Sequence, residues 1–137
     1  MALADHLARH RLADLFLDTL PCNAHTTATD ALWVGLPVLT CAGTTFVGRV
    51  CASLLNAIAL PEMIAGSLDA YEALALKLAT DAKALAAVKE KVARNRDSQP
   101  LFDNDRFRRH FEAAFISMHE RHQRGEAPAS FSVEPVS

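Results

Sequence analysis

The sequence predicts an α/β fold built on a parallel sheet, and two observations support this prediction. Residues 15–17 are a short, continuously apolar run, and residues 37–40 are predicted to form the next strand; each is followed by a polar loop and then by a segment with helical spacing of its apolar residues. Short apolar runs of this kind are typical of strands buried on both faces. The repetition of strand, loop and helix indicates parallel strands with right-handed crossovers, in which ligands bind at the carboxyl edge of the sheet.

The chain before the second strand divides into helix, strand, loop and helix. Residues 2–12 carry leucines four positions apart, which predicts a helix that leads into the first strand. Loop 19–25 follows that strand. The next helix is predicted over 26–34, and Gly35 is expected to end it because glycine readily adopts the left-handed conformation found after helices.

The second strand leads into loop 41–46 and then into a helix predicted over 46–58. A third, short strand is expected near 57–60, so at most three strands are visible in the sequence. A parallel sheet that small leaves its faces poorly covered. We therefore expect the sheet to continue upstream of Met1, which would make the chain a fragment.

The chain after position 61 is predicted to be mainly helical. Ser67 and Asp81 are suitable N-caps for two successive helices, and Asn104 or Asp105 is suitable for a last one. The last helix carries a stripe of large apolar residues whose helical spacing favours packing in a core, in part against structure upstream of the chain. The stripe consists of Phe107, Phe111, Phe115 and Met118.

Composition and charge bound the class of protein. The 137 residues are half hydrophobic and carry a formal charge of -2 at pH 7, which suits one domain and gives no general attraction to nucleic acid or to an anionic membrane. No segment reaches the roughly 20 consecutive apolar residues of a membrane span, and the first residues lack the apolar core of a secretory signal. We therefore expect a cytoplasmic protein without nucleic-acid or membrane partners.

The three cysteines predict neither a disulfide framework nor a zinc site. They are Cys22, Cys41 and Cys51, an odd number without CxxC spacing. Cys41 and Cys51 are predicted to be small core residues, and Trp33 is also expected in the core. The sequence therefore predicts no metal ligand.

The segment from Asp18 to Asp30 carries the candidate chemistry, since it leaves a strand, forms a loop and opens a helix. A helix N-terminus presents free backbone N–H groups and the positive end of the helix dipole, which suits it to binding a diphosphate. Side-chain donors at the same place come from His25, Thr26 and Thr27. Asp30, one turn later, is placed to accept hydrogen bonds from ribose hydroxyls.

The same residues also fit a helix start without a ligand. Thr27 and Asp30 stand in the T-x-x-D relation of a capping box, and spacing alone favours that alternative. His25 has no metal partner at close spacing and no obvious serine or cysteine nucleophile. The sequence also lacks GxGxxG and P-loop motifs, which disfavours dehydrogenase-like and other phosphate-binding α/β proteins.

The stretch from His6 to Leu55 resembles the donor-binding half of the O-GlcNAc transferase and SPINDLY-type glycosyltransferase family. The resemblance rests on a long motif, CN-x-HTT-x-x-D-x-LW-x-G-x-P, which runs from Cys22 to Pro37. Similarity continues to about Met118. It implies the C-terminal, Rossmann-like domain of a two-domain GT-B fold, the domain that mainly holds UDP-N-acetylglucosamine in that family.

Carried over position by position, the resemblance implies a nucleotide-sugar site. His6 and Arg9 would lie beside the uracil, and Asp30 would hold the ribose. The family is metal-independent, so no metal or cofactor is expected beyond the UDP-sugar donor substrate. The residues implied for the diphosphate are His25, Thr26 and Thr27.

The resemblance also implies what this chain does not contain. The family's phosphate-binding lysine and acceptor-side histidine would lie upstream of Met1, as would the tetratricopeptide repeats that present protein substrates. We therefore expect no catalytic residue here and no activity of the chain alone. Ala24, Ala28 and His10 stand where some relatives have glycine, and these are small changes around the loop.

We predict a C-terminal UDP-sugar-binding domain over 1–123 and a disordered tail over 124–137. The predicted function is to bind the UDP moiety of UDP-N-acetylglucosamine, or of a related nucleotide sugar, for transfer to Ser or Thr of proteins. The acceptor protein would bind through the missing upstream regions. The alternative is a noncatalytic, truncated module that acts through protein partners.

Overall fold

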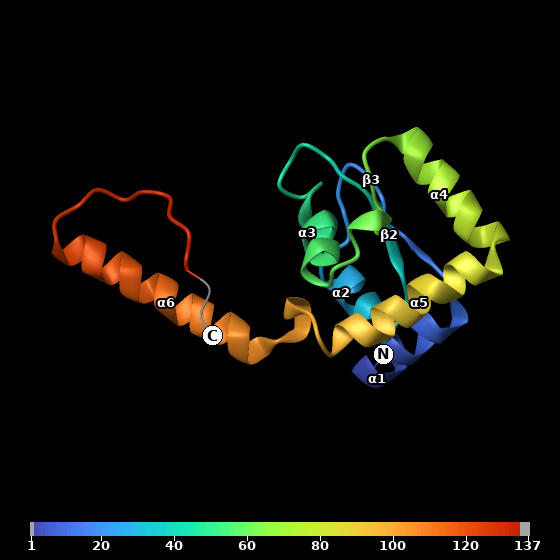
Figure 1. Cartoon of the computed structure of the whole chain (residues 1–137), viewed down its shortest axis with the longest axis horizontal. Coiled ribbons are helices and arrows are strands. Elements are labelled where there is room, and N and C mark those ends of the chain that lie inside the picture. The colour runs from blue at the N-terminus through green and yellow to red at the C-terminus, as the bar shows by residue number, and fades with distance from the viewer. Residues whose placement is uncertain (1, 135–137) are drawn as a thin grey trace. The chain divides into compact units, whose positions relative to one another are not determined.

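The computed structural model describes residues 2–134, and these residues contain an α/β fold (Figure 1). Their sheet has three strands, β1 (Phe16–Leu17), β2 (Val38–Cys41) and β3 (Ile64–Ala65), in the order β1-β2-β3. Both pairings are parallel, with β1 beside the first half of β2 and β3 beside its second half. All three strands therefore end at the same edge of the sheet.

The chain forms two compact units, one reaching Leu101 and one beginning at Phe102. The first unit holds the sheet. Its helices are α1 (Leu3–Arg9), α2 (Thr26–Trp33), α3 (Val50–Ala57), α4 (Leu68–Thr80) and α5 (Ala82–Arg96), with the short 3-10 helices η1 (His10–Leu12) and η2 (Pro61–Met63).

The core of the first unit surrounds β2. All four residues of this strand are buried, as the sequence predicts for a strand covered on both faces. The strand contacts α2, α3 and α4 as well as its two neighbours, and Figure 1 shows α3 and α4 on either side of the strands. The largest fully buried side chains are Leu32, Leu39, Leu55, Ile58, Leu60 and Met63.

The N-caps of α4 and α5 are those predicted from the sequence. The Ser67 hydroxyl accepts a hydrogen bond from the N–H of Ala70 at 3.2 Å. The Asp81 carboxylate accepts from the N–H groups of Lys83 and Ala84, each at 3.0 Å. The first-turn N–H groups have no acceptor within the helix, and these side chains supply one.

The third strand does not lie at residues 57–60, where the sequence predicts it. Residues 57–60 end α3 instead, because the N–H of Leu60 donates to the carbonyl of Leu55 and Ala59 takes a positive φ of 57°. The Asn95 amide donates to the carbonyl of Ile58 at 2.9 Å and satisfies this helix end. The third strand follows at β3, after the 3-10 turn η2.

Trp33 is half exposed, so its predicted place in the core is wrong. The buried face of α2 consists of Ala28, Ala31 and Leu32, and the next residue turns about 100° away from that face. The Trp33 ring lies 5.8 Å from the guanidinium carbon of Arg96, which is a cation–π distance. By contrast, the predicted burial of Cys41 and Cys51 is confirmed.

The second unit consists mainly of α6 (Asn104–Gln123), which the short 3-10 helix η3 (Pro100–Phe102) precedes. Its N-cap is Asp103 and not the predicted Asn104 or Asp105, and the Asp103 carboxylate accepts from the N–H of Arg106 at 2.9 Å. The apolar stripe of α6 is exposed in this chain, with side chains between 48% and 66% accessible, so it forms no core within the described residues. Residues 126–134 form no helix or strand, and 135–137 of the predicted tail lie outside the described part.

Candidate functional site at the carboxyl edge of the sheet

Two loops meet at the carboxyl edge of the sheet, residues 18–25 after β1 and residues 42–49 after β2. The N–H of Asn23 donates to the carbonyl of Val47 at 3.0 Å and joins the loops. Within the second loop, the N–H of Gly43 donates to the carbonyl of Gly48 at 2.7 Å. A Cβ on Gly43 would lie 3.1 Å from the Gly48 Cα, so this close backbone approach favours glycine.

The buried carboxylate of Asp18 organises the first of these loops. Asp18 directly follows β1 and is only 4% exposed. Its Oδ1 accepts hydrogen bonds from the N–H groups of Thr19, at 2.9 Å, and of Ala24, at 2.6 Å. Its Oδ2 accepts from the Thr40 hydroxyl on β2 at 2.6 Å. Sequence reasoning did not single out Asp18 as a site residue, although an acidic residue ending an apolar strand was the available signal.

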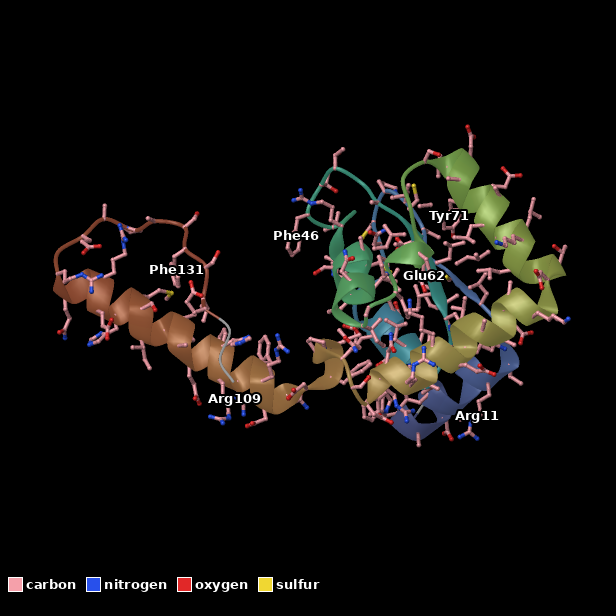
Figure 2. The ribbon with its side chains drawn as sticks, viewed as in Figure 1. Arg11, Phe46, Glu62, Tyr71, Arg109 and Phe131 are labelled. Carbon is pink, nitrogen blue, oxygen red and sulfur yellow. The ribbon has the colours of Figure 1, made fainter. Side chains whose placement is uncertain are left out.

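Two further groups surround Asp18 from α3 and α4. The Tyr71 hydroxyl on α4 donates to the backbone carbonyl of Asp18 at 2.8 Å, and Figure 2 shows Tyr71 on the side of α4 that faces the strands. Burial raises the pKa of the Cys51 thiol to about 12, and the charge of Asp18 adds to this effect. The same two causes, in the same order, raise the pKa of Tyr71. Both groups are therefore protonated donors at neutral pH.

The N-terminus of α2 carries no side-chain cap. Its N-cap is His25, with φ −107° and ψ −93°, and no side chain accepts a cap hydrogen bond there. Thr27 is the second residue of the helix, so the capping box with Asp30 is not formed. Thr26 and Thr27 are exposed. The first-turn N–H groups thus lack the side-chain acceptor that usually occupies this position.

The His25 ring lies at this helix start, and one of its two nitrogens lacks a hydrogen-bond partner in the described part of the chain. Its Nε2 is buried and has no hydrogen-bond partner among the described residues. The ring meets Phe46 edge to face, with centroids 6.5 Å apart. Phe46 is 75% exposed, and Figure 2 shows it at the outside of loop 42–49. A buried ring nitrogen without a partner is costly in a protein, so a polar ligand would satisfy it.

The structure brings His6 on α1 to Asp30 on α2. The His6 Nε2 donates to the Asp30 carboxylate at 3.2 Å, and both side chains are about one fifth to one quarter exposed. His10 supports His6, since its Nδ1 donates to the His6 carbonyl at 3.0 Å and the rings meet edge to face. Arg9 is the exposed last residue of α1, and no described hydrogen bond or ion pair joins it to the other predicted site residues.

Residues 2–134 contain no group of three or more His, Cys, Asp or Glu side chains arranged to hold a metal ion. None of the helices in this range is both long and apolar enough to cross a membrane.

Parallel strands alternating with helices, with an uncapped helix N-terminus at the carboxyl edge of the sheet, are typical of Rossmann-like α/β proteins. Residues 1–111 match glycosyl transferase family 41. The chain therefore belongs to this family, which confirms the resemblance predicted from the sequence.

Similar proteins agree with this assignment. The chain is 38% identical over 131 residues to the probable UDP-N-acetylglucosamine–peptide N-acetylglucosaminyltransferase SEC of Arabidopsis thaliana, covering 95% of this chain and 13% of the relative. It is also 38% identical to the Caenorhabditis elegans UDP-N-acetylglucosamine–peptide N-acetylglucosaminyltransferase, covering 90% of this chain and 11% of the relative. The chain thus spans a small part of these relatives' length.

A solved structure supports the fold directly. A mutant of the Thermobaculum terrenum O-GlcNAc transferase superposes with a TM-score of 0.81 at 36% identity, over 86% of this chain and 23% of that one. The predicted fold class, a partial Rossmann-like sheet of the GT-B type, is confirmed.

Proposed function

We propose that this chain is the donor-binding part of a protein N-acetylglucosaminyltransferase and that it binds the UDP moiety of UDP-N-acetylglucosamine or a related nucleotide sugar. One observation carries the proposal: the N-terminus of α2 has no side-chain cap, and the buried Nε2 of His25 beside it has no partner. Free N–H groups, the positive helix end and an imidazole nitrogen together suit a diphosphate.

The remaining site residues fit a nucleoside next to that diphosphate. Thr26 and Thr27 add exposed hydroxyls at the helix start, and we assign them to the diphosphate with His25. We assign Asp30, one turn along α2, to the ribose hydroxyls. His6 and Arg9 on α1 are assigned to the uracil, and the 3.2 Å contact between His6 and Asp30 supports adjacent positions for base and ribose.

The proposed chemistry is stabilisation of the leaving group. When an acceptor serine or threonine oxygen bonds to the sugar, its hydroxyl proton passes to a base outside this chain, the bond from the sugar to UDP breaks and negative charge grows on the diphosphate. Preorganised donors at such a position stabilise the transition state. We propose that the reaction needs no metal and that the acceptor protein and the catalytic groups belong to the rest of the transferase, so that this chain is inactive alone.

A second candidate is a noncatalytic module that acts through protein partners, and the exposed apolar stripe of α6 favours it. We also propose a cytoplasmic location for either candidate. Its support is the exposed free thiol of Cys22, which is typical of a reducing compartment.

Calorimetric titration with UDP tests the proposal. We expect saturable binding by the wild type and at least roughly ten-fold weaker binding by His25→Ala and Asp30→Ala, the effect of losing a charge-assisted hydrogen bond. His122→Ala, which removes an exposed histidine from α6, is the matched control and should bind UDP like the wild type. A wild type that is folded by circular dichroism but does not bind UDP would overturn the proposal in favour of the noncatalytic module.

A further inference from the structure

We propose that Asp18 is a positioning residue that holds His25 and the N-terminus of α2 in the geometry required for the diphosphate. The inference rests on the proposed function. Asp18 does not need to touch the ligand, because its oxygens are already occupied by three donors from its own surroundings. It acts through the loop that leads from β1 to α2.

The first step of the argument is the path from the carboxylate to the helix. The Asp18 Oδ1 accepts the N–H of Ala24 at 2.6 Å, and Ala24 is the residue immediately before His25. This bond closes a loop of seven residues onto the end of β1. Since His25 is the N-cap of α2, the bond fixes the backbone on which both the imidazole and the first-turn N–H groups are carried.

The second step is that Asp18 is itself held from several elements. The Thr40 hydroxyl on β2 donates to Oδ2 at 2.6 Å, and the Tyr71 hydroxyl on α4 donates to the Asp18 carbonyl at 2.8 Å. The backbone N–H of Asp18 donates to the Leu39 carbonyl at 2.9 Å. Asp18 is therefore held by β2 through both its carboxylate and its backbone, and by α4 through its carbonyl, which makes it a fixed point for the loop.

The third step concerns energy. A carboxylate that is only 4% exposed carries a large desolvation cost unless hydrogen bonds compensate it. Here the compensating donors include the two loop N–H groups of Thr19 and Ala24, so the charge and the loop conformation stabilise each other. Removal of the carboxylate would leave the Ala24 N–H without its acceptor and release the segment before His25.

The test compares Asp18→Ala with a variant that disturbs a buried polar group away from the site. Asn95→Ala is suitable, because the Asn95 side chain is 6% exposed and its amide bonds the end of α3. We expect Asp18→Ala to weaken UDP binding on the order of ten-fold, as for loss of a hydrogen bond to a charged acceptor. Asn95→Ala should lower the melting temperature but leave the Kd for UDP unchanged.

Nuclear magnetic resonance supplies a readout that does not depend on UDP. Asp18→Ala should speed hydrogen exchange of the Ala24 amide and shift the His25 ring resonances, whereas Asn95→Ala should do neither. An Asp18→Ala protein with wild-type resonances at both positions overturns the inference. If the wild type fails to bind UDP, the proposed function fails, and these two resonances still decide whether Asp18 orders the loop.

Asp18→Asn is the second variant in case Asp18→Ala does not fold. It keeps an acceptor oxygen for both loop N–H groups and replaces the other oxygen by an amide that can donate to Thr40. We expect roughly three-fold weaker UDP binding and moderately faster exchange at Ala24, because neutral acceptors bond less strongly than charged ones. Wild-type values for both would overturn the inference.

Discussion

The roles of some residues at the site can be predicted from the sequence, whereas the roles of others depend on contacts that only the folded chain makes. His25, Thr26 and Thr27 stand in the motif, and the helix start that they form was predicted. The carboxylate of Asp18 was not singled out, because its partners include Thr40 on another strand, 22 positions away, and the folded sheet brings them together. The contact between His6 and Asp30, 24 positions apart, likewise depends on the docking of α1 beside α2 and not on spacing along one helix.

The raised pKa of the Cys51 thiol predicts that the stability of the fold depends on pH. Burial and the charge of Asp18 raise its pKa from 9.0 to about 12, so the fold favours the protonated thiol. The stability contributed by this group is complete below pH 9 and is lost as the pH rises toward 12, because the unfolded chain then releases the proton first. Cys51→Ala should remove this loss.

Urea unfolding of the wild type and of Cys51→Ala at pH 8 and pH 10.5 measures the effect. The stability advantage of the wild type over the variant should shrink at the higher pH, while burial and the charge of Asp18, the two largest causes of the raised pKa of Tyr71, are present in both proteins. A difference between the two proteins that stays constant with pH would contradict the prediction.

At the scale of elements, the sequence predicted those helices and strands whose position depends on residues close together in the chain. The strands β1 and β2 and the caps of α4 and α5 follow from apolar runs and capping residues that are close together in the sequence. The third strand was misplaced because residues 57–60 are apolar for a different reason: Ile58 and Leu60 are buried at the end of α3. An apolar run alone does not distinguish a buried helix end from a strand.

The two helix caps predict measurable losses of stability. Ser67→Ala and Asp81→Ala should each lower the free energy of unfolding by about 1 kcal/mol, with the larger loss at Asp81, since its carboxylate accepts two N–H groups and the Ser67 hydroxyl accepts one. Chemical denaturation at neutral pH measures both. Ser67→Asp, which retains an acceptor, is the control and should be nearly as stable as the wild type. Alanine variants with the stability of the wild type would show that the caps contribute nothing.

At the scale of the whole molecule, the sequence predicted the fold class and the family, but not where large apolar side chains lie. Trp33 and the stripe of α6 have the size and spacing of core residues, and both are exposed within the described residues. Spacing shows that residues share a face, but what covers that face depends on the rest of the molecule. The predicted packing of the stripe against structure upstream of Met1 stays a prediction, and the chain spans only 13% of its Arabidopsis relative.

The exposed stripe predicts that apolar residues of α6 contribute little to the stability of this chain. Phe111 and Phe115 are about half exposed, and the Phe111 ring stacks on Phe107 and meets Phe115 edge to face. The helix also has its own ion pairs, such as Arg108 with Glu112 at 2.8 Å. The double substitution of Phe111 and Phe115 by Ser should therefore lower the free energy of unfolding by no more than about 1 kcal/mol.

The buried Leu55 provides the matched control, since Leu55→Ala removes a fully buried side chain and should cost about 2–5 kcal/mol. The double serine variant should also bind less of an apolar dye and associate less in sedimentation, because a contiguous apolar surface has been removed. If the serine variant instead loses as much stability as Leu55→Ala, the stripe must be buried in solution. That result would mean that α6 contributes to a core of this chain, and the exposure that favours a noncatalytic module would no longer support it.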